Sequence, residues 1–328
     1  MVKTMYNWGI LGCGRIAVRM AEALKLVPDA VLYAAGSRST EKAEAFREEN
    51  GFLKAYGSYE ELCNDENVDI VYIATPHNYH VDAAILAMNH GKHVLIEKPM
   101  TVNTKGMDEI IKTASENKVF CMEGMWMRFF PVYEKVLDWI KSGRIGDIVS
   151  VSADFCITVP VDDMGCRLSN PDLAGGALLD LGVYPLNFAA MFLGSCPKEI
   201  QGVAAFSPAG VDMNDSVSLL YENNAAATLQ TSLLYKGSDT GYIYGTKGHI
   251  KIPHYIWADS AELFLGKELA ETAESFFEKG FQYEVSEVHR CIAQGKQESE
   301  IMPLCETRNI TAIMDQLRAR WNFIYPFE

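Results

Sequence analysis

The sequence has no C-x-x-C pair, although eight cysteines are scattered along its 328 residues. Without such pairing the cysteines are predicted to be free thiols, which favours a reducing, cytoplasmic location. Positive charge is also scarce, because 29 Lys and Arg residues stand against 43 Asp and Glu residues, for a formal net charge of −14 at pH 7. An acidic chain of this kind argues against nucleic acid or an anionic membrane as a partner.

Membrane, export and metal signals are missing as well. We find no apolar run of about 20 residues, the length that a membrane-spanning helix needs. The first apolar run begins at Trp8, which leaves no room for a signal peptide. His77 and His80, like His90 and His93, are three residues apart, but no cysteine or carboxylate cluster accompanies them. The sequence therefore predicts neither a membrane span nor a metal site.

The chain is long enough for two domains, and 48% of its residues are hydrophobic. Its first third alternates between strand-like and helix-like segments. The expected strands lie near 6–11, 30–37, 69–74, 93–97 and 119–123, and the expected helices near 15–27, 40–50, 80–90 and 104–117. This alternation predicts a parallel, doubly wound sheet, a Rossmann-type α/β domain over residues 1–123.

After Gly124 the pattern changes to one of helices and closely spaced strands. The expected helices lie near 131–141, 174–193, 283–294 and 306–321, and the expected strands near 145–157, 216–221, 226–234, 241–244 and 249–252. Residues 124–328 are therefore predicted to form an α+β domain with a large, mostly antiparallel open sheet. Two of its strands are more apolar than one half-buried face requires, so we expect a homodimer or a higher homo-oligomer.

A glycine turn follows the first expected strand and opens the first helix. Gly12 allows the tight turn, Gly14 lets the backbone approach a pyrophosphate, and Ala17 permits close packing of helix on strand. The amino end of the helix, with Arg15 and Ile16, then offers free N–H groups to phosphates. In this context the turn predicts a dinucleotide site.

The end of the second expected strand indicates which dinucleotide binds. An NAD site would present an acid to the ribose there, but no acid occurs before Glu41. Arg38 can pair with a 2′-phosphate through its planar guanidinium group, and Ser37 can add a hydroxyl. The sequence therefore favours NADP, with NAD as the alternative.

Further cofactor contacts are expected in the loops that follow later strands, because ligand-binding loops of such sheets lie beyond the carboxyl ends of the strands. These loops contain the candidates Thr75, Pro76, His80, Glu97 and Lys98. The second domain adds Asp180 and Tyr184, which are four residues apart and are expected on one face of an apolar helix. Polar groups in such a helix need partners, which makes both candidates for a site.

Several motifs resemble those of the Gfo/Idh/MocA family of oxidoreductases, which is named after glucose-fructose oxidoreductase and inositol dehydrogenase. They are Gly9–Ala17, Ala74–Pro76, Glu97–Pro99, Gly143–Gly146 and Gly175–Tyr184. Within the family, residues 123–131 are most similar to the branch that contains dimeric dihydrodiol dehydrogenase, which in mammals also acts as an NADP-dependent D-xylose dehydrogenase. Tyr184 stands where many members have histidine.

The resemblance implies that Lys98 contacts the substrate hydroxyl and the nicotinamide ribose, and that Asp180 and Tyr184 complete the polar site. It also implies a cis Lys98–Pro99 peptide. Alcohol oxidation needs a group that takes the hydroxyl proton, and free Lys and Tyr both have a pKa of roughly 10. We expect Tyr184 to be the acid/base and Lys98 the electrostatic partner that Asp180 holds charged, with the reverse assignment of Tyr184 and Lys98 open.

Aromatic residues are expected to line the substrate pocket. Trp126, Phe129 and Phe155 suit the C–H face of a sugar or diol ring, although each is also an ordinary core residue. Arg128 could pair with a substrate acid or with a protein carboxylate. The leading hypothesis is an NADP-dependent dehydrogenase for a secondary alcohol of a sugar, polyol or cyclic diol. The alternatives are an NAD-dependent glycosidase of the family type and a non-catalytic NADP sensor.

Overall fold

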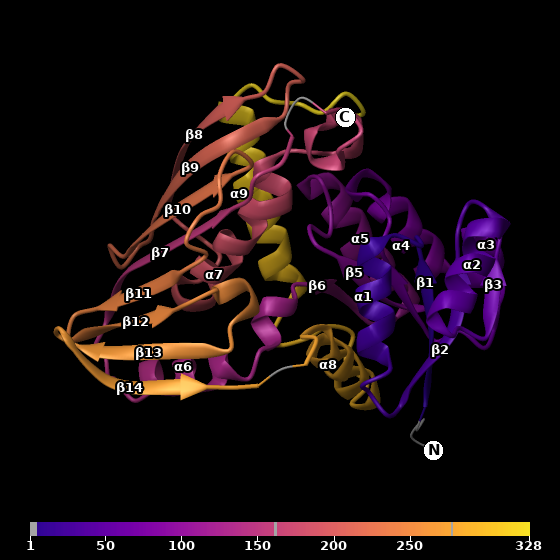
Figure 1. The fold of residues 1–328 in the computed structure, drawn as a ribbon, viewed down its shortest axis with the longest axis horizontal. Coiled ribbons are helices and arrows are strands. Elements are labelled where there is room, and N and C mark those ends of the chain that lie inside the picture. The colour runs from indigo at the N-terminus through magenta and orange to yellow at the C-terminus, as the bar shows by residue number, and fades with distance from the viewer. Residues whose placement is uncertain (1–4, 161–162, 277) are drawn as a thin grey trace. The chain divides into compact units, whose positions relative to one another are not determined.

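The structure is a computed structural model that describes residues 5–160, 163–276 and 278–328. The chain forms two compact units, one of Met1–Trp126 with Glu278–Arg308 and one of Met127–Phe277 with Asn309–Glu328. Figure 1 shows the fold of the chain. The helix near 283–294 was expected in the second domain, but the structure assigns it to the first unit.

The first unit contains a six-stranded parallel sheet in the order β3-β2-β1-β4-β5-β6. Its strands are β1 Tyr6–Leu11, β2 Ala30–Gly36, β3 Lys54–Tyr56, β4 Ile70–Ile73, β5 His93–Glu97 and β6 Cys121–Gly124, and its helices are α1 Arg15–Leu24, α2 Thr40–Asn50, α3 Tyr59–Asn64, α4 His80–Asn89, α5 Thr104–Asn117 and α8 Phe281–Ala293. This is the Rossmann order, in which the direction of strand addition reverses beside β1. The doubly wound sheet is confirmed, and β3 and α3 are additions to the expected elements.

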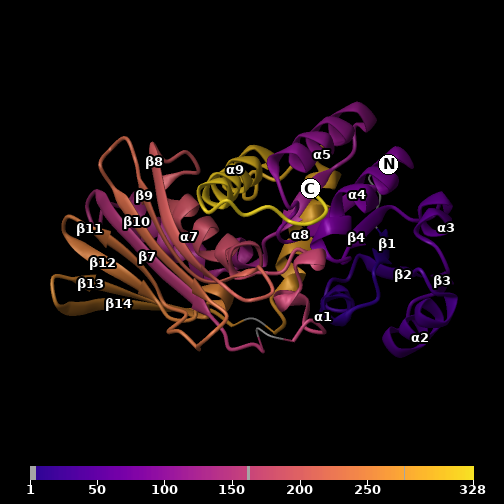
Figure 2. The ribbon, with the colours of Figure 1, turned by 90° about the horizontal axis from the view of Figure 1, so that it is seen from above.

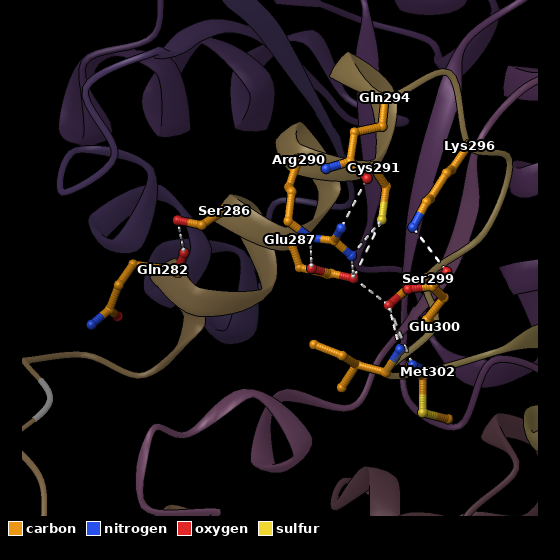
Figure 3. A network of polar contacts seen from close by, with 11 residues as sticks. Gln282, Ser286, Glu287, Arg290, Cys291, Gln294, Lys296, Ser299, Glu300 and Met302 are labelled. Atoms are coloured by element: carbon orange, nitrogen blue, oxygen red, sulfur yellow. Dashed lines mark hydrogen bonds and ion pairs between the residues drawn. The ribbon is translucent and has the colours of Figure 1, made fainter. Parts of the chain in front are cut away.

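Helix α8 belongs to the first unit because it packs on α1 and is tied to the segment that follows it. Figure 3 shows Glu287 of α8 accepting hydrogen bonds from Arg290 and Ser299. Burial alone would raise the pKa of Glu287, but the Arg290 guanidinium and the neighbouring donors hold it below its usual value. The sequence gives no local sign of this packing, since α1 and α8 are more than 250 residues apart.

The second unit contains an eight-stranded sheet in the order β14-β13-β12-β11-β7-β10-β9-β8, in which only the β7/β10 pair is parallel. Its strands are β7 Ile148–Cys156, β8 Glu199–Phe206, β9 Asp212–Leu220, β10 Ala226–Ser232, β11 Gly241–Gly245, β12 Gly248–Ile252, β13 Ser260–Leu265 and β14 Glu268–Glu274, and its helices are α6 Val132–Lys141, α7 Val183–Leu193 and α9 Leu304–Arg320, of which Leu304–Arg308 count with the first unit. Figure 2 shows α7 and α9 on one face of this sheet. The expected mostly antiparallel sheet is confirmed.

The segment expected as one helix over 174–193 is divided. Ala174 and Gly176 have φ values of 54° and 120°, which a right-handed helix excludes. A π-helical turn, Leu178–Gly182, follows and continues into α7. The stretch Pro171–Leu193 is also long and apolar enough to pass for a membrane span, contrary to our expectation, but 83% of its most apolar window is buried inside the protein, as in a core helix.

Candidate active site

The turn between β1 and α1 is built to receive an anion. Gly12 has a φ of 97°, and a Cβ atom on it would lie 2.7 Å from the Ala74 carbonyl oxygen, so only glycine fits. Side chains cap the amino ends of α2, α3 and α5, whereas no side chain in the described part of the chain caps α1, α4 or α8. A Cβ atom on Gly14 would meet open space. The unpaired N–H groups of α1, with exposed Arg15 and half-buried Ile16 beside them, fit a pyrophosphate.

The end of β2 presents an arginine and no acid. Arg38 is exposed, and its guanidinium carbon lies 5.5 Å from the centre of the Tyr79 ring. Ser37 is nearly buried and accepts a hydrogen bond from the Ser39 amide at 3.4 Å. The Ser39 hydroxyl binds Glu41 at 2.6 Å, and this bond lowers the pKa of Glu41. Glu41, the first acid of this region, is thus already engaged by the protein.

The loop after β4 holds a hydroxyl group without a protein partner. Thr75 is 7% exposed, and its Oγ1 atom has no hydrogen bond among the described residues. A buried hydroxyl of this kind fits a cofactor atom, because an unpaired one is costly. Half-buried Pro76 follows it. His80 is fully buried and its ring nitrogens lie 2.8 Å and 3.0 Å from the carbonyl oxygens of Thr75 and Pro99, so the ring joins two loops.

The loop after β5 begins with Glu97 and Lys98. Tyr72 of β4 donates a hydrogen bond to the buried Glu97 carboxylate, which also accepts one from the Lys98 amide at 3.1 Å. These contacts fix the backbone from which the half-buried Lys98 side chain extends. The Lys98–Pro99 peptide is cis, as the resemblance implied.

Glu284 of α8 is a buried acid that sequence reasoning missed. Its side chain is fully buried, and neither carboxyl oxygen has a hydrogen-bond partner among the described residues. A Cβ atom on Gly124 would lie 3.7 Å from Glu284 Oε2, and Gly124 pairs with Glu97 across β5 and β6. Burial, with the Glu97 charge as a second cause, raises the pKa of Glu284 well above its usual value. The first unit therefore holds a buried acid, close to the end of β5, whose charged form is disfavoured.

Two aromatic rings of the first unit are also in contact. Trp126 is half-buried, and its ring lies 4.8 Å from that of Phe281, the first residue of α8. Phe281 was not predicted, because its helix was expected in the other domain. The neighbouring candidates Arg128 and Phe129 belong to the second unit and are nearly buried, at 6% and 9% exposure.

In the second unit, the π-helical turn presents Asp180 and α7 presents Tyr184, both nearly buried. The wide turn keeps residues four or five apart on one side, and such turns are frequent at functional sites. Arg167 lies 2.8 Å from Asp180 in an ion pair. Arg167 was not among the predicted site residues, because it precedes the helical segment and no local pattern in the sequence links it to Asp180.

The ring of Tyr184 belongs to an aromatic cluster. Phe155, near the end of β7, meets the Tyr184 ring edge to face at 5.3 Å and the Trp257 ring at 6.2 Å. Lys236 lies 5.5 Å from the centre of the Trp257 ring. Phe155 and Tyr184, both predicted site residues, are thus in contact within the unit, and Trp257 is an addition that only the fold of β12 and the residues after it reveals.

Comparison with known proteins identifies the family. Residues 6–125 match an oxidoreductase family with an NAD-binding Rossmann fold, and residues 133–251 match the GFO/IDH/MocA C-terminal domain. Trans-1,2-dihydrobenzene-1,2-diol dehydrogenase of Xenopus laevis is 35% identical over 98% of this chain and 99% of its own length, and the Homo sapiens enzyme of that name is 32% identical over 98% of each.

Solved structures agree with this match in fold. A 3-ketoreductase from Actinomadura kijaniata, in complex with NADP and TDP-benzene, superposes with a TM-score of 0.86 at 24% identity, over 96% of this chain and 97% of its own. Levoglucosan dehydrogenase, in complex with NADH and levoglucosan, superposes with a TM-score of 0.87 at 19% identity, over 96% of each chain. The matches over nearly the whole length, with the glycine turn and Rossmann order described above, show that this chain belongs to the GFO/IDH/MocA family of oxidoreductases.

Proposed function

We propose that this oxidoreductase is an NADP-dependent dehydrogenase that acts on a secondary alcohol of a sugar, polyol or cyclic diol. The proposal that a dinucleotide cofactor binds rests on polar groups of the first unit that are available to a ligand. These are the uncapped amino end of α1, the unpaired Thr75 hydroxyl and the exposed Arg38 at the end of β2. Arg38 supports NADP over NAD because it can pair with the 2′-phosphate.

The substrate class is supported by the relatives and by the second unit. The most similar relatives reported above are named dihydrobenzenediol dehydrogenases, and one structural neighbour binds the sugar derivative levoglucosan. In this chain the ring of Phe155 contacts the rings of both Tyr184 and Trp257, so the three form an aromatic cluster. Such a cluster suits the C–H face of a ring whose hydroxyl group is to react.

In the proposed mechanism, the glycine turn before α1, Arg38 and Thr75 would hold a nicotinamide cofactor, which would supply the acceptor for the hydride of the carbinol carbon. Tyr184 takes the proton of the reacting hydroxyl, and the Lys98 ammonium stabilises the negative charge that develops on that oxygen. A free tyrosine has a pKa of about 10, so the positive charge of Lys98 would also favour the tyrosinate that acts as base. Asp180, with Arg167 as its ion-pair partner, orients the polar groups. The proposal requires both units to act on one substrate hydroxyl.

The test is a panel of aldoses, polyols, cyclic diols and dicarbonyls, followed by NADPH absorbance in both directions. We expect at least one class to be oxidised with NADP⁺, or its carbonyl product to be reduced with NADPH. Release of reducing sugar without net NADPH would indicate glycosidase chemistry instead. Tight NADPH binding without turnover on any substrate class would indicate a sensor.

We also propose that the second unit's sheet pairs with a second copy of this chain. The face away from α7 carries a row of contacting rings, with Tyr242 stacked on Tyr244 and His249 stacked on Phe264. Val203 on the same sheet is 70% exposed. Solvent-accessible aromatic rings of this kind are typical of an interface, and the sheet of an antiparallel domain often buries only one face internally.

A further inference from the structure

Strand β9 carries two acids that both lie inside the second unit. Asp212 and Asp215 are 0% and 1% exposed. Residues three apart in a regular strand point to opposite faces, but the register between β8 and β9 shifts where Phe206 pairs with Asp212 and Ala205 with Asn214. This bulge turns both carboxyl groups toward the covered face of the sheet.

Asp212 holds the amino end of the segment that bears Asp180 and Tyr184. Its Oδ2 atom accepts a hydrogen bond from the Leu178 amide at 2.5 Å, at the start of the π-helical turn. A Cβ atom on Gly176 would lie 2.2 Å from Asp212 Oδ1, so the chain passes directly over the carboxyl group. A negative charge at this end of a helix also meets its partial positive charge.

Asp215 is the partner of Asp212. Its Oδ2 atom accepts a hydrogen bond from the Thr231 hydroxyl at 3.3 Å, whereas the Oδ1 atoms of both acids have no other group to bind among the described residues. Burial, the charge of Asp212 and a hydrogen bond between the two carboxyl groups raise the pKa of Asp215 well above its usual value. One proton shared by the two groups satisfies both free oxygens, because two adjacent buried carboxylates cannot both ionise at low cost.

The other ionisable groups described near Asp212 and Asp215 have partners of their own, so they do not take the place of a proton between the two carboxyl groups. Tyr325 has its pKa raised well above the usual value by burial first and then by Asp212, and its hydroxyl donates to the Gly175 carbonyl at 2.7 Å. Arg318 lies over the Tyr325 ring and is paired with Asp315 and Glu328. The Arg318 guanidinium is therefore already paired with two other carboxylates.

We propose that Asp212 and Asp215 are positioning residues that share one proton and hold the π-helical turn so that Asp180 and Tyr184 keep their places. The inference rests on the proposed function for its consequence in catalysis, but the shared proton does not depend on it. Loss of that proton at high pH leaves two buried negative charges and loosens the turn.

The test compares Asp215→Asn and Asp212→Asn with the wild-type enzyme and with the exposed control Asp138→Asn. In Asp215→Asn the new amide can still donate a hydrogen bond to Asp212 but does not titrate. We expect the kcat of this variant near neutral pH to stay within about threefold of wild type, and its kcat to decline less than that of wild type as pH is raised. Asp212→Asn loses the charge that faces the turn, so we expect its kcat to fall about tenfold or more while KM and NADPH affinity change little.

Thermal unfolding followed against pH gives a readout that is independent of activity. A carboxyl whose pKa is raised on folding stabilises the fold fully only below its unfolded pKa, near 4, and this stabilisation is lost as pH rises through the folded pKa. The melting temperature of the wild type should therefore decline relative to that of Asp215→Asn as pH rises above about 4. If the melting temperatures of the two proteins change in parallel with pH, the two acids do not share a proton. This result would hold whether or not any alcohol is oxidised. An unchanged kcat in Asp212→Asn would contradict the positioning role. If that variant fails to fold, the pH dependence of kcat in Asp215→Asn tests the positioning role instead.

Discussion

At the scale of single residues, Arg38 has a role that binding can measure. Its guanidinium group lies exposed beside the Tyr79 ring at the end of β2. Arg38→Ala should weaken NADPH binding and leave NADH binding nearly unchanged, because only NADPH carries the 2′-phosphate. A charge-assisted hydrogen bond contributes about 1.5–3 kcal/mol, so we expect a loss of roughly 10- to 150-fold in NADPH affinity, measured by fluorescence titration.

The matched control for Arg38 is Lys112→Ala, which removes one positive charge from an exposed side chain of α5 in the same unit. It should leave both affinities unchanged at moderate salt. Equal affinity of the wild type for NADPH and NADH would contradict the proposed cofactor preference.

Glu284 predicts a pH dependence of stability. Its pKa is raised in the folded protein, so its contribution to stability is greatest below about pH 4.5 and declines as pH rises toward the folded pKa. Glu284→Gln removes the titration but keeps the size of the side chain. We expect the variant to be more stable than wild type near neutral pH, on the order of 1 kcal/mol by urea unfolding, and the difference to shrink toward pH 4. A constant difference across this range would show that Glu284 is not a buried neutral acid.

At this scale the sequence predicts features that depend on local geometry. The positions of Gly12 and Gly14 follow from one strand-turn-helix segment, and the structure confirms that segment, with a φ of 97° at Gly12 and open space beside Gly14. The sequence did not predict Glu284 or Arg167 as site residues. The groups that they contact come close to them only when the chain folds. Glu284 meets Gly124 across about 160 residues, and its own helix was expected in the other domain.

At the scale of elements, the break before the π-helical turn depends on one glycine. Gly176 has a φ of 120° and its missing Cβ would lie 2.2 Å from the Asp212 carboxyl. Gly176→Ala should therefore cost about 2–5 kcal/mol, the sum of backbone strain and overpacking. Gly194→Ala is the control, because Gly194 has a φ of 84° and open space around it, and it should cost only about 1–2 kcal/mol. Both losses of stability are measured by thermal unfolding. Equal losses for the two variants would mean that the Asp212 side chain moves away from the new methyl group at no cost.

The apolar pattern over 174–193 predicted that this segment is buried but gave the wrong start of the helix. Residues 174–190, including Asp180 and Tyr184, are all buried. The pattern does not report φ values, so it gives no sign that Ala174 and Gly176 leave the right-handed helical region. The short elements β3 and α3 were missed for a related reason, since three to six residues carry too little pattern.

At the scale of the whole molecule, the proposed association of two or more copies of this chain can be tested by measuring the mass of the particle in solution. If the ring-lined face of the eight-stranded sheet is an interface, Tyr244→Glu should place a charge among these rings and favour monomers. Light scattering should give at least twice the 36.5 kDa chain mass for wild type and a lower mass for the variant. Leu53→Glu, at an exposed position of the first unit, is the control and should not change the mass. A monomeric wild type at micromolar concentration would contradict the assembly.

The central claim is that the first unit's Lys98 and the second unit's Tyr184 serve one hydride transfer. Under this proposal the first unit contributes the charged group and the second unit contributes the acid/base. The fold of each unit follows from sequence patterns, whereas the joint action of the two residues needs an experiment. Tyr184→Phe removes only a hydroxyl group, and Lys98→Met keeps most of the side chain, so neither should disturb packing much.

The most direct measurement is the rate of NADPH formation in a single turnover, with the best alcohol from the substrate panel and saturating NADP⁺. We predict that Tyr184→Phe and Lys98→Met each lower this rate by about 10²–10⁴, the range for an acid/base group, while NADPH affinity stays within about threefold of wild type. The control Tyr244→Phe, on the exposed face of the sheet, should leave the rate unchanged. If Tyr184→Phe alone keeps the wild-type rate, the acid/base role passes to Lys98, and if both variants keep it, the mechanism is wrong.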